Sequence, residues 1–164
     1  MISRTGGLLA VVLLASCGGG GTFTPATPPA SACALLTPAD VATIFPDAMP
    51  GSGYPISGTS DLWSGGCIWL SNQPSSELLD LIIYGAKTFQ GFKSLAVPPD
   101  TGTVTTPVTG LGTSARYWEQ VSVGTGLWAL EGTWSAILNA YLFTPPRTEA
   151  QLHPLVAKVL GQLE

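Results

Sequence analysis

Two glutamates are the side chains best placed for acid–base chemistry. Glu119 and Glu131 lie on two consecutive predicted strands, residues 115–123 and 127–131, which would pair in one sheet. A pair of carboxyl groups can hydrolyse a glycosidic bond when one donates a proton and the other acts as base or nucleophile. Pairs of exposed surface acids are far commoner than catalytic pairs. We therefore expect no catalytic site and no enzyme activity, and keep a small hydrolase using these glutamates as the alternative.

The other catalytic signals are incomplete. His153 is the only histidine, and it lies at a predicted helix start with no nucleophile beside it in the pattern. Residues 110–115 (Gly-Leu-Gly-Thr-Ser-Ala) have the letters of a dinucleotide-binding loop, but that loop must be followed by a helix. Residues 116–121 continue as a strand, so the glycines predict a turn. We expect no cofactor and no metal site, because one histidine and three cysteines cannot build most structural zinc sites.

Cys17 follows a pattern typical of protein export. Arg4 supplies a positive charge, and residues 7–15 form an apolar run shorter than the about 20 residues of a membrane-spanning helix. Residues 14–17 (Leu-Ala-Ser-Cys) resemble the lipobox of bacterial lipoproteins, whose cysteine thiol receives a diacylglycerol before the signal is removed. The alternative is an ordinary signal peptide with an incidental cysteine. We predict a lipoprotein signal peptide over residues 1–16 and acylation, including palmitate, at Cys17.

Acylation would hold the protein on a membrane. More than one acyl chain makes such anchoring stable, so we expect an extracytoplasmic domain on the cell membrane or the outer membrane. Residues 17–32 contain the lipidated cysteine, four glycines and then mainly Pro, Thr, Ala and Ser, a composition that predicts a flexible tether. Residues 33–164 have the length of a single domain.

Two cysteines remain once Cys17 carries lipid. Cys33 and Cys67 would then lie in an oxidising compartment, where paired thiols form disulfides. A redox-active pair is the alternative, but a separation of 34 residues differs from the Cys-x-x-Cys spacing of redox motifs. We therefore expect a structural disulfide.

Hydrophobic periodicity predicts an α+β domain. One helix begins after Thr37, with Pro38 at its first position and Asp40 as the capping acid; a short one follows Thr88, and an amphipathic one covers residues 152–163. Apolar or alternating runs predict strands at 66–71, 78–85, 115–123, 127–131 and 134–143, with short strands inside the loop-like segments 46–66 and 97–109. We expect an antiparallel sheet with N-terminal, middle and C-terminal helices packed on it.

Tryptophan is the most informative aromatic residue. Four of the five tryptophans lie on predicted strands, where aromatic side chains pack against neighbouring strands: Trp69, Trp118, Trp128 and Trp134. Trp63 instead lies in the glycine- and serine-rich segment 58–66. It is either a lid over the core or an exposed anchor for a ligand or partner, and it is our candidate binding residue.

Three short motifs and the closing helix carry a resemblance. The motifs are residues 33–41 (Cys-Ala-Leu-Leu-Thr-Pro-Ala-Asp-Val), 66–69 (Gly-Cys-Ile-Trp) and 110–118 (Gly-Leu-Gly-Thr-Ser-Ala-Arg-Tyr-Trp). Together they resemble the small cell-envelope lipoproteins of unknown function that are common in actinobacteria. The resemblance implies that Cys33 pairs with Cys67 and that the α+β fold is similar to the PsbP-like sandwich. It implies no reaction, because that family has no assigned catalytic residues.

The charge balance argues against one class of partner. Six Lys and Arg oppose ten Asp and Glu, which gives a net charge of -4 and no basic stripe for nucleic acid. We expect a lipid-anchored, non-enzymatic domain that binds an envelope ligand or a protein partner. The alternatives are the cell-envelope hydrolase and an inhibitory or structural protein that docks through Trp63.

Overall fold

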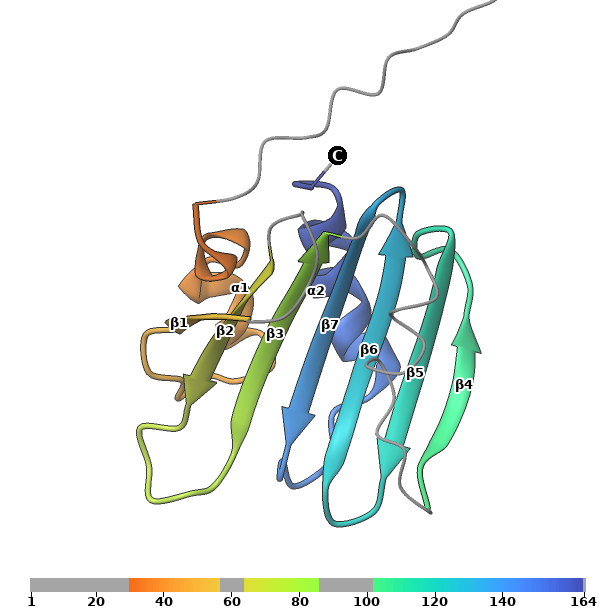
Figure 1. Cartoon of the computed structure of the whole chain (residues 1–164). Coiled ribbons are helices and arrows are strands. Elements are labelled where there is room, and N and C mark those ends of the chain that lie inside the picture. Colours follow the sequence, from red (N-terminus) through yellow and green to blue (C-terminus); the bar gives the residue numbers. More distant parts are fainter. Residues whose placement is uncertain (1–29, 57–63, 86–101, 164) are drawn as a thin grey trace, which may run out of the picture.

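One antiparallel sheet of seven strands dominates the computed structural model, which describes residues 30–56, 64–85 and 102–163 (Figure 1). The strand order is β1-β2-β3-β7-β6-β5-β4, so β1 and β4 are the edge strands. The strands are β1 (Ser52–Pro55), β2 (Ser64–Leu70), β3 (Leu78–Gly85), β4 (Val104–Val108), β5 (Ser114–Gln120), β6 (Gly124–Glu131) and β7 (Trp134–Tyr141). The helical elements are the 3-10 turn η1 (Ala32–Leu35), α1 (Pro38–Ala42) and α2 (Glu149–Leu160).

The expected α+β domain with three helices packed on its sheet is wrong, and with it the PsbP-like sandwich. The fold is dominated by its sheet: α1 has five residues and α2 has 12. The short strands expected inside the two loop-like segments are present as the edge strands β1 and β4, and Pro55 and Pro107 are tolerated there because an edge strand has free N–H positions. The middle helix expected after Thr88 lies outside the described residues.

The local signals for α1 are confirmed. Thr37 is the N-cap: its hydroxyl accepts from the N–H of Asp40 at 3.2 Å, and the carboxylate of Asp40 accepts from the N–H of Thr37 at 2.7 Å. Pro38 occupies the first position, where its missing N–H leaves no bond unmade. This reciprocal capping box satisfies two N–H groups that the helix cannot satisfy internally.

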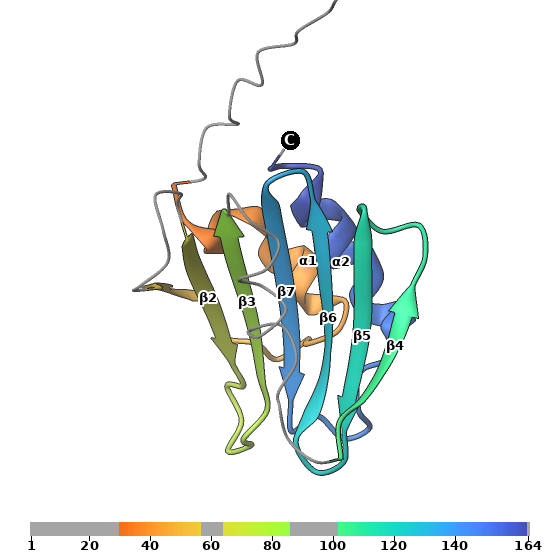
Figure 2. The ribbon, with the colours of Figure 1, turned by 45° about the vertical axis from the view of Figure 1, so that its right-hand side comes forward.

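The apolar core lies on the face of the sheet that carries the helices. Figure 2 shows α1 and α2 behind the sheet, and α2 packs against β6 and β7. Alternate side chains of β3 and β7 point to this side and are buried: Leu79, Leu81, Ile83, Ala136 and Leu138. They share one core with Leu152, Val156 and Val159 of α2. This alternation follows from the two-residue period of a strand.

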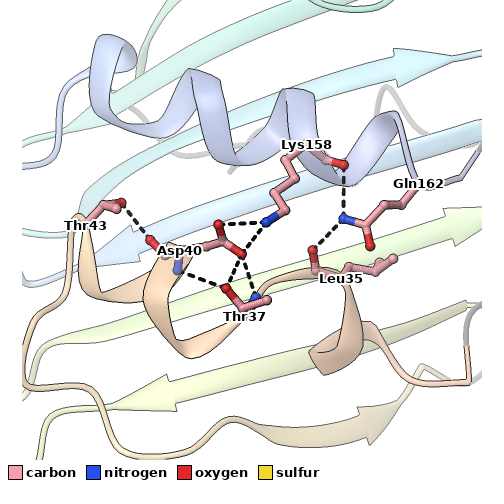
Figure 3. A network of polar contacts seen from close by, with 6 residues as sticks. All are labelled: Leu35, Thr37, Asp40, Thr43, Lys158 and Gln162. Atoms are coloured by element: carbon pink, nitrogen blue, oxygen red, sulfur yellow. Dashed lines mark hydrogen bonds and ion pairs between the residues drawn. The ribbon is translucent and has the colours of Figure 1, made fainter.

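Polar contacts join the N-terminal helical segment to α2 (Figure 3). The ammonium group of Lys158 donates to both carboxylate oxygens of Asp40, at 2.8 and 2.7 Å. The side-chain amide of Gln162 donates to the carbonyl of Leu35 at 2.9 Å. These contacts connect segments that are more than 100 residues apart in the sequence. The position of the short helix α1 therefore depends on α2 as well as on the contacts of its own five residues.

The expected disulfide between Cys33 and Cys67 is confirmed, with a Cα–Cα distance of 5.0 Å. It joins η1 to β2, and Cys67 is fully buried. Within residues 30–56, 64–85 and 102–163, no helix is long and apolar enough to cross a bilayer.

Candidate functional site

The second face of the sheet carries aromatic and polar side chains. On β3, Asp80 and Tyr84 alternate with the core residues, and on β7 Asn139 and Tyr141 do the same. The pairing register places side chains from β1, β5 and β6 on the same face. We call this set the polar–aromatic face: Tyr54, Asp80, Tyr84, Trp118, Trp128, Asn139 and Tyr141.

Asp80 and Asn139 form the polar centre of this face. They are direct register partners on β3 and β7, the pair of strands that joins the two halves of the sheet. Asp80 is half-buried and Asn139 is 6% exposed. Buried polar groups need hydrogen-bond partners, and both residues receive theirs from aromatic side chains two strands away.

Tyr54 reaches Asp80 by crossing a glycine. Its hydroxyl donates to Oδ1 of Asp80 at 2.7 Å. Gly66 on β2 lies between them, and a Cβ atom at that position would be 2.1 Å from Cζ of Tyr54. The ring therefore lies directly over the glycine backbone, and any other residue at position 66 would displace it.

Trp118 reaches Asn139 in the same way on the other half of the sheet. Its indole N–H donates to Oδ1 of Asn139 at 3.2 Å. A Cβ atom on the intervening Gly126 of β6 would lie 2.2 Å from Nε1 of Trp118. The ring is 1% exposed and also contacts Tyr141, with ring centroids 6.0 Å apart.

The electrostatics of the face centre on one carboxylate. Burial raises the pKa of Asp80, and the hydrogen bond from Tyr54 opposes that increase. Burial also raises the pKa of the hydroxyls of Tyr54, Tyr84 and Tyr141, and the nearby charge of Asp80 adds to the effect at all three. The described ion pairs are Lys158–Asp40 and His153–Glu149, so neither supplies a cation to Asp80.

The two glutamates considered for the alternative of a hydrolase are not brought together. Glu119 pairs with Thr125 of β6, whereas Glu131 pairs with Trp134 at the other end of that strand. Six residues of strand at about 3.4 Å each separate them by about 20 Å. That distance exceeds the range of carboxylate pairs in glycosidases.

The remaining sequence candidates are placed as follows. His153 lies in α2 with Nδ1 at 2.8 Å from the carboxylate of Glu149, one turn earlier in the helix. Gly110 and Gly112 have positive φ angles in a turn that leads into β5 and not into a helix, as expected. Cys17 and Trp63 lie outside the described residues.

Sequence reasoning missed the central residues of the polar–aromatic face. Asp80 is the one charged residue in the apolar run of β3, which is a readable signal because a charge in such a run needs a reason. Gly66 and Gly126 each lie inside a strand, where glycine often marks a close approach of another group. The pairing of Asp80 with Asn139 depends on the strand order and has no local signal.

An apolar groove lies between α1 and β2 on the helical side. Its volume is about 440 Å³, and Leu36, Phe45, Met49 and Trp69 contribute to its lining. No acid, base or hydroxyl lines it. In the part of the chain that the structure describes, no group of three His, Cys, Asp or Glu could hold a metal ion.

No family model matches the chain, and neither curated proteins nor solved structures gave a match.

Proposed function

We propose that the chain is a lipid-anchored, extracytoplasmic binding protein without catalytic activity, and that its ligand binds to the polar–aromatic face. The observation that carries this proposal is the Asp80–Asn139 pair at the centre of the sheet. A half-buried carboxylate costs folding free energy unless its charge is compensated. A ligand that binds the carboxylate of Asp80 would compensate this charge and would explain why the position carries an acid.

The residues of the face are suited to binding and not to covalent chemistry. Asp80, Tyr54 and Tyr141 are half-buried and offer a carboxylate beside aromatic rings, a combination typical of ligand sites, whereas Asn139, Tyr84, Trp118 and Trp128 are buried beneath them. Among the described residues of the polar–aromatic face there is neither histidine nor cysteine, and Asp80 has no second acid beside it.

The anchor at Cys17 supports an extracytoplasmic location. An apolar run after Arg4 and a lipobox-like sequence before Cys17 are typical of bacterial lipoproteins. The Cys33–Cys67 disulfide is compatible with an oxidising compartment. Labelling of cells with palmitate, followed by membrane fractionation of the wild type and Cys17→Ser, tests this part. Equal amounts of the wild type and of Cys17→Ser in the membrane fraction would contradict the proposed anchor.

Binding is testable by tryptophan fluorescence, because the buried rings of Trp118 and Trp128 belong to the polar–aromatic face and report changes in their surroundings. Fractions of cell envelope are titrated into the mature, lipidated protein in maltoside micelles. We expect a saturable change from at least one fraction, and a much weaker one from Tyr54→Ala, which removes the ring over Gly66. Activity of the wild type in a screen of envelope hydrolase substrates, lost in Glu131→Gln, would contradict the proposal.

A further inference from the structure

We infer that the ligand group bound at Asp80 is a positively charged amine, an alkylammonium cation. This inference rests on the proposed binding function and names the chemical class of its ligand. The juxtaposition that carries it is one carboxylate without a cationic partner among the described residues, hydrogen-bonded to Tyr54 on a sheet face that also carries Tyr84 and Tyr141.

The carboxylate of Asp80 has one oxygen in use. Oδ1 accepts the hydrogen bond from Tyr54, and no donor among the described residues bonds to Oδ2. Asp80 is half-buried and not enclosed. Among the described residues of the face, Arg116 on β5 is the nearest basic residue by register. The backbone of β5 is three strands from that of β3, about 14 Å across the sheet at the usual strand spacing, and Arg116 is level with Ile82 and not with Asp80.

The aromatic surroundings favour an organic cation. Tyr54, Tyr84 and Tyr141 all lie close enough to Asp80 for its charge to affect their hydroxyls. The faces of tyrosine and tryptophan rings attract ammonium groups, and aromatic residues around a carboxylate are a common way to bind them. An alkylammonium group matches both features, since its charge pairs with the carboxylate and its alkyl carbons contact the rings.

Other ligand chemistries fit this face less well. An anion would be repelled by Asp80, which is the single acid of the described face. A metal ion of the magnesium or calcium type needs several oxygen ligands, and the described residues offer no cluster of three acidic, histidine or cysteine side chains. A neutral polar ligand would leave the charge of Asp80 uncompensated.

The test compares a cation with an uncharged molecule of the same shape. Choline is titrated into the full lipidated protein in maltoside micelles, with tryptophan fluorescence and calorimetry as readouts, and 3,3-dimethylbutan-1-ol is the uncharged probe. We expect saturable binding of choline and at least tenfold weaker binding of the alcohol. Asp80→Asn keeps an oxygen that accepts the Tyr54 hydroxyl, and we expect it to lower the affinity for choline at least tenfold.

A matched control separates the site from a general effect of charge. Glu119→Gln also removes one negative charge, but Glu119 is exposed and lies on the other side of β5 from Trp118; we expect unchanged choline affinity. Equal binding of choline by Asp80→Asn and the wild type, or of the alcohol and choline by the wild type, would overturn the inference. If the wild type does not bind choline while envelope fractions still give a saturable signal, the ligand class is wrong and the proposed binding function stands. If neither choline nor any envelope fraction gives a saturable signal, the ligand class and the binding function are both wrong.

Discussion

Asp80 and Asn139 face each other on the neighbouring strands β3 and β7. Each accepts a hydrogen bond from an aromatic side chain two strands away, which lies over a glycine of the intervening strand. The two halves of the sheet thus repeat one local arrangement: Tyr54 over Gly66, and Trp118 over Gly126. The repeat brings two rings to one polar pair from opposite sides. The central pair of strands therefore holds the chemistry, and the outer strands position the rings around it.

The glycines under the rings are expected to tolerate no side chain. In Gly66→Ala and Gly126→Ala, the added methyl group would lie about 2 Å from the ring above it, so the ring must move or the strands must separate. Overpacking of this kind costs about 1–3 kcal/mol. Urea denaturation checks the loss in the free energy of unfolding.

Gly161→Ala is the matched control for the glycine substitutions. Gly161 ends α2 with a φ angle of -64°, and an added Cβ would meet nothing closer than 3.6 Å. We expect its stability to stay within about 0.5 kcal/mol of the wild type, as for most surface substitutions. A loss as large as that of Gly66→Ala would show that the ring contacts are not the cause.

Asp80→Asn is expected to raise stability at neutral pH. Burial raises the pKa of Asp80, so the folded state holds the proton of this carboxyl more tightly than the unfolded state does. Wild-type stability therefore falls as pH rises from near 3.8 through the folded pKa, and asparagine has no such loss. The difference in Tm between the variant and the wild type should be small at pH 3 and should grow toward pH 7.

A stabilising effect of Asp80→Asn would separate two explanations of this residue. A purely structural role through the Tyr54 hydrogen bond predicts equal or lower stability in the variant at every pH. A binding role predicts gained stability together with lost affinity, the usual trade-off at functional sites. Thermal unfolding from pH 3 to pH 7, followed by circular dichroism, distinguishes these two patterns.

Much of the local structure was readable from the sequence. The capping box at Thr37 and Asp40 depends on residues close in sequence, and it forms as expected. The disulfide followed from the cysteine count and the expected compartment. Local signals of this kind do not depend on the strand order.

The strand order and the candidate site were not readable. Short strands were expected in the segments that form β1 and β4, and they are present, but the order of the seven strands has no such local signal. Asp80 meets Asn139 only because β3 pairs with β7, which is 49 residues later in the chain when measured from Gly85 to Trp134. Such a non-local pairing leaves no periodicity in either strand.

Acid is expected to weaken the link between α1 and α2. The hydrogen bond from Lys158, together with that from Thr37, lowers the pKa of Asp40 from 3.8 to about 2. The stabilisation by this carboxylate is thus fully present above pH 3.8 and is lost as pH falls from 3.8 to about 2. Acid unfolding of the wild type and Asp40→Asn checks this, because the variant should lack the part of the transition in that window.

Lys158→Met tests the cause of that shift. Methionine keeps an apolar side chain of similar length at this position of α2 but cannot donate to Asp40. We expect the pKa of Asp40, measured by carbon NMR of its carboxyl group, to move back toward 3.8. An unchanged value would mean that the hydroxyl and the backbone N–H of Thr37 maintain the low pKa without Lys158.

Removal of the disulfide is expected to lower stability more than any of these substitutions. Cys33 and Cys67 close a loop of 34 residues, and the loss of such a crosslink costs about 3–4 kcal/mol in the chain-entropy model. The Cys33→Ser and Cys67→Ser double variant and the reduced wild type should show the same loss in urea denaturation. Since the disulfide joins η1 to β2, and β2 provides Gly66 under Tyr54, the double variant should also bind choline more weakly. Full stability and full affinity in the reduced protein would show that the capping box, the Asp40–Lys158 pair and the sheet are enough to hold this end of the molecule.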